Sequence, residues 1–123
     1  MSLNKAMLIG HLGHDPEFNH TKGGKAVAHF SLATHEGKDA NGEKKTEWHK
    51  IVAWEKVAET CQKYLKKGSL VFIEGRLATS KWKDKQNQER TSTEIIADRM
   101  HMLDRKPDAA AENKTVNTEK YEP

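Results

Sequence analysis

The sequence predicts an all-β domain that contains a single helix. Five segments have the composition and alternation of strands, and one amphipathic helical segment separates the third strand from the fourth. The dipeptide Asn41-Gly42 is a strong hairpin signal between two of the strand segments. The chain has 123 residues, which suits one such domain and hardly two.

Three strands are expected before the helix, over residues 4–13, 25–35 and 45–54. Asp15-Pro16 closes the first strand, because proline cannot continue a ladder of backbone hydrogen bonds. In the second strand, small or apolar residues alternate with the residues of the opposite face. The face that we expect to be buried carries Ala26, Ala28, Phe30 and Leu32.

A helix is expected over residues 55–67, after the third strand. Its apolar residues follow one stripe of a 3.6-residue period, as in a helix that buries one face. The stripe consists of Val57, Ala58, Cys61, Tyr64 and Leu65. Glu55 at the start suits the helix dipole, and Gly68 is expected to cap the C-terminal end.

Two further strands are expected over residues 69–83 and 89–103, joined by the polar turn 84–88. The resulting order is β-β-β-α-β-β. A helix between the third and fourth strands is typical of an OB-fold, a five-stranded Greek-key barrel that commonly binds oligonucleotides. The pattern alone leaves other all-β arrangements open.

Residues 1–103 form the expected domain, and residues 104–123 are expected to be a disordered polar tail. The tail carries no aliphatic residue larger than alanine except Val116. The net charge of the chain is +3, and the tail has more acids than bases, so the positive charge lies on the domain. This favours a polyanion as the partner without proving one.

The segment TEWHKIVAW at residues 46–54 is the most informative. The two-residue period of a strand places Trp48, Lys50 and Trp54 on one face and His49 on the other. Two indoles beside a lysine would stack on unpaired bases and contact a phosphate. The alternative is that the tryptophans are core or interface residues.

Trp82 lies between Lys81 and Lys83, close to the polar turn of the last hairpin. Such an arm could extend from the barrel and close over a nucleic-acid strand. The alternative, an aromatic residue that caps the end of the barrel, stays open at this point. The basic residues that we select for phosphate contact are Lys5, Lys50, Lys56, Lys67 and Lys81, although a lysine face is often only solvated.

No pattern in the chain indicates a metal site, a cofactor or catalysis. His11 and His14 point to opposite faces of a strand, and no cysteine pair accompanies them. Cys61 lies on the apolar stripe of the helix and is expected to be a core residue. Because no catalytic constellation is visible, we expect a protein that is not an enzyme. The single cysteine, together with the lack of a signal peptide or apolar span, predicts a cytoplasmic protein that has no membrane contact.

Five segments resemble the bacterial single-stranded DNA-binding protein family, in order and with the family's spacing. They are NKAMLIGHLGHDPE at 4–17, FSLAT at 30–34, TEWHKIVAW at 46–54, YLKKGSLVFIEGRL at 64–77 and KWKD at 81–84. The resemblance implies an OB-fold and a homotetramer that binds single-stranded DNA without sequence preference, in replication, recombination and repair. It also implies that Trp48, Trp54 and Trp82 stack on bases.

The resemblance further implies that His49 and Phe72 lie at subunit contacts and that the N-terminal strand joins subunits. Two features depart from the family pattern. Many members have an additional aromatic residue after LAT, whereas this chain has His35-Glu36-Gly37-Lys38, so one stacking site is absent. The acidic tip that usually recruits replication and repair proteins is also absent, because the chain ends EKYEP.

Three alternatives remain. A primosomal OB-fold adaptor would be a dimer that binds single-stranded DNA and helicase-loading partners. An RNA-binding OB or cold-shock-like module would prefer ribo-oligomers. A nuclease would need a catalytic constellation, and none is visible in the sequence.

Overall fold

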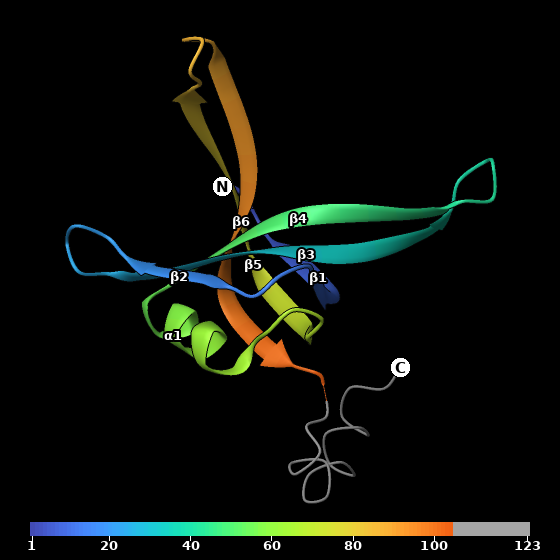
Figure 1. Ribbon diagram of the computed structural model, residues 1–123, viewed down its shortest axis with the longest axis horizontal. Coiled ribbons are helices and arrows are strands. Elements are labelled where there is room, and N and C mark those ends of the chain that lie inside the picture. Colours follow the sequence, from blue (N-terminus) through green and yellow to red (C-terminus); the bar gives the residue numbers. More distant parts are fainter. Residues whose placement is uncertain (105–123) are drawn as a thin grey trace, which may run out of the picture.

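The computed structural model describes residues 1–104, which form six strands and one helix (Figure 1). The elements are β1 (Ala6–Leu12), β2 (Glu17–His20), β3 (Ala26–Lys38), β4 (Lys44–Trp54), α1 (Glu55–Tyr64), β5 (Leu70–Lys83) and β6 (Glu89–Met102). The predicted tail lies outside the described residues except for Asp104, whose carboxylate accepts a hydrogen bond from the backbone of Leu70 at 2.7 Å.

Five of the strands form a closed ring of backbone pairing. The sheet order is β1-β5-β6-β4-β3-β2, and an additional pairing between β1 and β3 returns the sheet to its start. The β4–β6 pair is parallel, and the other pairs are antiparallel. The expected fold class, an all-β barrel with a helix after the strand that ends at Trp54, is therefore confirmed.

β2 is a sixth strand that the sequence pattern does not predict. It pairs only with β3, outside the closed ring, and Phe18 packs against the core. Its four residues, EFNH, are too short and too polar to stand out as a strand. Pairing with β3 creates this strand, which is a tertiary effect.

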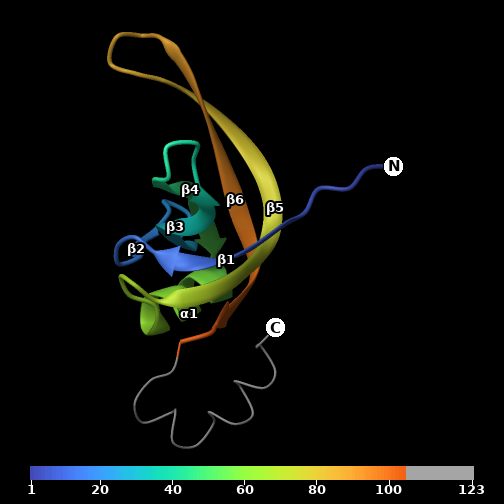
Figure 2. The ribbon, with the colours of Figure 1, turned by 90° about the vertical axis from the view of Figure 1, so that its right-hand side faces the viewer.

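The core lies inside the ring, and α1 covers one end of it. The alternating face of β3 is buried as expected, with Ala26, Ala28, Phe30 and Leu32 all in the core cluster. Ala58 and Cys61 of α1 are fully buried against it, and burial raises the pKa of the Cys61 thiol to about 12. Cys61 is therefore a core residue, as predicted. α1 lies on the side of the barrel away from the β5–β6 hairpin (Figure 2).

α1 ends at Tyr64, three residues earlier than predicted. Leu65 already has extended backbone, with φ −94° and ψ 150°. Gly68 does not cap the helix. It adopts φ 90° in a separate turn, in which the Ser69 N–H donates to the Lys66 carbonyl at 3.0 Å. The lysines that resemble a helix C-terminus in the sequence belong to this turn.

Three hairpin ends share one loop geometry. In each five-residue loop, an oxygen of the first side chain accepts a hydrogen bond from the backbone of the fifth residue, and the fourth residue has left-handed backbone. The loops are residues 21–25, 39–43 and 84–88, and their left-handed residues are Gly24, Gly42 and Asn87. The β3–β4 and β5–β6 hairpins project from the barrel in different directions (Figure 1).

Among residues 1–104, no helix combines the length and the apolar character that a membrane crossing requires.

Glu55, the first residue of α1, has left-handed backbone, with φ 53°. A residue with a Cβ atom pays about 1 kcal/mol for this conformation, whereas glycine does not. We expect Glu55→Gly to raise the free energy of unfolding by up to about 1 kcal/mol, less the loss of an acid at the helix N-terminus. Urea denaturation measures this change.

Glu59→Gly is the matched control, because Glu59 is an exposed residue in the middle of α1. Glycine there should lower the free energy of unfolding by about 1 kcal/mol. Equal destabilisation by both variants would show that Glu55 carries no strain.

Candidate nucleic-acid interface

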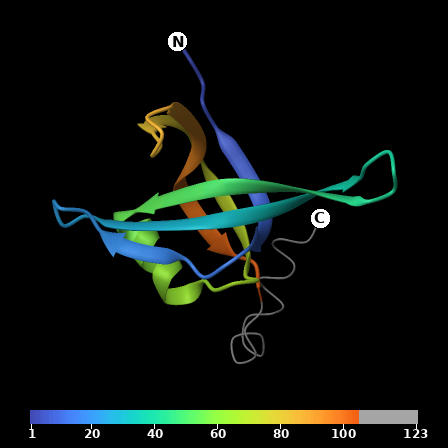
Figure 3. The ribbon, with the colours of Figure 1, turned by 45° about the horizontal axis from the view of Figure 1, so that its top comes forward.

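Trp48, Lys50 and Trp54 lie on the outer face of the barrel, as the alternation in β4 predicts. Their partners on β3 are Ala33, Ser31 and Val27, which belong to the face opposite the core. The indole residues are 56% and 39% exposed, so neither is a core residue. Figure 3 shows β3 and β4 side by side along the hairpin that carries this face.

Small and β-branched residues lie between the exposed side chains of this outer face. Val27 and Val52 are buried although they point away from the core, and Val27 pairs with Trp54 across the strands. Ala33, which pairs with Trp48, is only 6% exposed. Larger neighbouring side chains therefore cover these positions, which form an apolar surface next to the two indoles.

Gly13, after the end of β1, leaves space for the indole of Trp48. A Cβ atom at Gly13 would lie 2.5 Å from Cζ3 of Trp48, far inside van der Waals contact. The backbone of Gly13 is held by a hydrogen bond to the Ser31 carbonyl at 3.0 Å. No local pattern in the sequence identifies Gly13 as part of the site, because the contact joins segments 35 residues apart.

The outer face continues from β4 onto β6 and β5. The Lys50 ammonium donates to the Ser92 hydroxyl at 3.1 Å, and Lys50 pairs with Glu94 in the parallel ladder. The β5–β6 register then places Trp82 opposite Arg90, in phase with Ser92 and Glu94. Partners in a ladder point to the same side, so Trp82 shares the outer face with the other two tryptophans.

Trp82 does not cap the barrel. It is 50% exposed on the β5–β6 hairpin, whose outer half extends beyond the ring of strands (Figure 2). The loop of this hairpin is held by Asp84, whose carboxylate accepts backbone hydrogen bonds and pairs with Arg90 at 2.9 Å. The backbone N–H of Gln88, and then Arg90, lower the pKa of Asp84. The structure therefore favours the projecting-arm interpretation.

The other selected lysines are not gathered on this face. Lys81 alternates to the opposite side of the arm from Trp82 and lies 4.0 Å from Glu89. Lys5 precedes β1 and forms an ion pair with Glu74, which lowers the pKa of Glu74. These two amines already have carboxylate partners, which the sequence did not indicate.

Lys56 lies in the first turn of α1, two residues beyond Trp54, and is exposed. Lys67 lies in the α1–β5 connection, where its backbone N–H donates to Asp15 at 2.8 Å. This contact brings the Lys67 segment next to the β1–β2 connection that contains Gly13. Lys56 therefore follows Trp54 along the chain, and the Lys67 segment lies next to the connection whose Gly13 lies against Trp48.

His49 and Phe72 lie away from the tryptophans. His49 is half-buried on the opposite side of β4, and its Nε2 hydrogen-bonds to the Thr34 hydroxyl at 2.9 Å. Phe72 stacks on His101 with ring centroids 6.0 Å apart, and it pairs with Ile9 of β1. The predicted orientation of His49 is confirmed, and its role between subunits stays a prediction.

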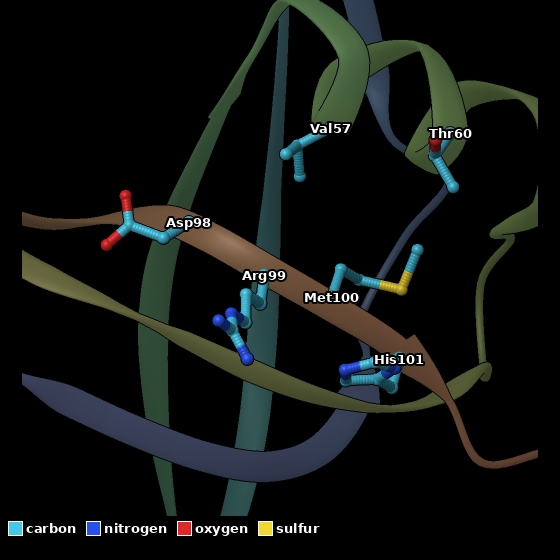
Figure 4. Close-up of a pocket in the computed structure, with 6 residues that line it drawn as sticks. All are labelled: Val57, Thr60, Asp98, Arg99, Met100 and His101. Carbon is cyan, nitrogen blue, oxygen red and sulfur yellow. The ribbon is translucent and has the colours of Figure 1, made fainter.

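A separate hollow of about 350 Å³ lies between α1 and the last part of β6 (Figure 4). Val57 and Thr60 approach it from the helix, and four consecutive residues of β6 line its other side. The latter are Asp98, Arg99, Met100 and His101. No tryptophan lines this hollow, so it is distinct from the outer face described above.

Comparison with known proteins identifies the family to which this chain belongs. The model of a family described as the single-strand binding protein family matches residues 3–103. A single-stranded DNA-binding protein from Chlorobaculum tepidum is 54% identical over 105 residues, which cover 82% of this chain and 65% of that protein. Its counterpart from Neisseria meningitidis serogroup A is 49% identical over 106 residues, covering 84% and 61%. The chain thus spans less than two thirds of the length of these curated relatives.

A solved structure described as a Plasmodium falciparum SSB complex with ssDNA superimposes with a TM-score of 0.74 at 41% identity. The match covers 85% of this chain and 97% of that one. The two chains are therefore similar in sequence as well as in fold.

Gly13→Ala is expected to displace the Trp48 indole from the barrel surface, because the new methyl group would occupy its position. With Trp54 and Trp82 replaced by phenylalanine, the remaining fluorescence reports Trp48 alone. We expect its emission to shift to longer wavelength as the indole becomes more hydrated. Gly23→Ala is the control, since the nearest atom to a Cβ there is 3.9 Å away. Unchanged emission in Gly13→Ala would contradict the contact.

Proposed function

Because the chain belongs to the single-strand binding protein family, we propose that it binds single-stranded DNA without sequence preference and catalyses no reaction. The observation that carries the proposal is the set of three exposed indoles on one outer face. In this role it would protect unpaired DNA in replication, recombination and repair, in the cytoplasm with the nucleoid.

Trp48 and Trp54 hold bases, and Lys50 between them binds a phosphate. Stacking on an aromatic ring is worth about 1–3 kcal/mol per base and tolerates every base, because all bases have a π-face. Trp54 follows Trp48 by six positions along the strand, a span of about 20 Å. A bound strand therefore extends over several nucleotides along β4, with the buried valines and Ala33 keeping the rings in place.

Trp82 adds a base contact on the projecting arm, beside Arg90. Because Arg90 is tied to Asp84, the loop keeps a guanidinium close to the indole while the arm remains ordered. Lys56 and Lys67 contact phosphates at the two ends of the tryptophan pair. Lys81 exchanges its carboxylate partner for a phosphate at little cost in free energy, because an exposed ion pair contributes at most about 1 kcal/mol. Lys5 is half-exposed and contacts a phosphate from its pair with Glu74.

A homotetramer completes the proposal, with the outer surface of β1 as one contact. Met7 and Ile9 are 61% and 57% exposed on this strand. One edge of β1 pairs with β5. At the other edge, β1 pairs with β3 only at His11 and Leu12, so within residues 1–104 no strand pairs with this edge over residues 6–10. An unpaired apolar edge favours pairing with a second copy. His49 and Phe72 belong to these subunit contacts.

Assembly into a tetramer raises the affinity for DNA above that of a single binding site. Each additional subunit engages the same DNA strand at a high effective concentration, so the affinity of the tetramer exceeds that of one site. Replication and repair proteins are further proposed partners.

Trp54→Ala is expected to weaken binding of oligo-dT by about fivefold to 150-fold, the equivalent of one lost stacking contact. Quenching of tryptophan fluorescence during titration measures the affinity of wild type and variant. Raising the salt concentration should weaken both proteins, because each phosphate contact releases a counterion.

Tyr64→Ala is the matched control, since Tyr64 is an exposed aromatic residue on α1. It should bind as wild type does. Wild-type protein that shows no saturable quenching would refute the proposed function.

Ile9→Glu is expected to break the homotetramer, because it places a charge on the apolar edge strand. Light scattering should give the mass of four chains for wild type and a smaller mass for the variant. Gln62→Glu adds the same charge on the exposed side of α1 and should leave the mass unchanged. A dimeric wild type with weak DNA binding would favour the primosomal adaptor instead.

A further inference from the structure

Two histidines share the outer face of the barrel with Trp48. His11 of β1 pairs with Ala33 of β3, and Ala33 pairs with Trp48 of β4. Ladder partners point to the same side, so these residues form one row across three strands. His35 follows Ala33 by two residues, opposite Thr46, and lies on the same side.

The two imidazoles form a pair. Their centroids are 6.5 Å apart and their planes are inclined by 43°, within the range in which aromatic rings interact. His35 is further held by a hydrogen bond between its Nδ1 and the Thr46 hydroxyl at 3.3 Å. Both histidines are exposed, so the rings are oriented by their neighbours and still accessible.

The chemistry of this surface suits a nucleic-acid strand. Imidazole rings stack on unpaired bases as the larger aromatic rings do, and their nitrogens can hydrogen-bond to phosphate or base. Glu47, the acid next to Trp48 in sequence, pairs with Thr34 and therefore points to the other side of the hairpin. Bases can thus approach the pair without meeting that carboxylate.

We propose that His11 and His35 form an additional base-stacking site, which holds the nucleotide next to the one on Trp48. The inference rests on the proposed function and adds specific residues to it. The site extends the path of the DNA from β4 across β3 to the end of β1.

The double variant His11→Ala/His35→Ala tests this site by oligo-dT titration of the full chain. We expect its affinity to fall about fivefold or more, as the loss of one stacking contact requires. His35→Phe should retain wild-type affinity, because the phenyl ring stacks without the imidazole nitrogens. Thermal denaturation should be unchanged, since both side chains are exposed.

His20→Ala is the matched control. His20 is an exposed histidine on β2 that contacts Phe18 ring to edge at 5.2 Å, and its partner Ala26 belongs to the core side of the sheet. This variant should bind as wild type does. An equal loss in His20→Ala, or a loss in His35→Phe as large as in the double variant, would overturn the stacking role.

Failure of the inference and failure of the proposed function are distinguishable. If wild type binds, Trp54→Ala binds more weakly and the double histidine variant binds normally, only the histidine site is refuted. If wild type shows no saturable binding, the proposed function fails and the histidine site fails with it.

Discussion

The pairing of β1 with β3 is the constraint on which the rest of the structure depends. It comprises only two residue pairs, yet it closes the sheet into a ring and encloses the core. The close approach requires Gly10, because a Cβ atom there would lie 2.2 Å from the Ala33 carbonyl oxygen. The same closure brings Gly13 under Trp48 and His11 beside Ala33. Core and candidate interface thus depend on one seam.

The long strands serve two purposes along their length. The first half of β5 is buried inside the barrel, and its second half forms the exposed arm that carries Trp82. An arm without a core depends on its own ladder and on its loop. Asp84 meets this need by accepting two backbone hydrogen bonds and pairing with Arg90. The arm can therefore hold an indole away from the barrel without losing its register.

Much of the fold could be predicted because its signals are local. The five strands of the ring and the helix occur where alternation, periodicity and turn residues indicate them. The errors occur where tertiary contacts override such signals. β2 is a strand because β3 is available to pair with it. α1 ends before Lys66 because the following turn is held by Ser69 and by a hydrogen bond from Gly68 to Leu12 in β1.

The sequence by itself determined that Trp48, Lys50 and Trp54 share a face, because side-chain alternation along a strand is a property of the backbone of that strand. Only the tertiary structure decided that Trp82 and His11 join this face and that Gly13 underlies Trp48. It also paired Lys5 and Lys81 with acids. Register between distant strands is set by non-local hydrogen bonds and by packing of a shared core, and no local pattern encodes it.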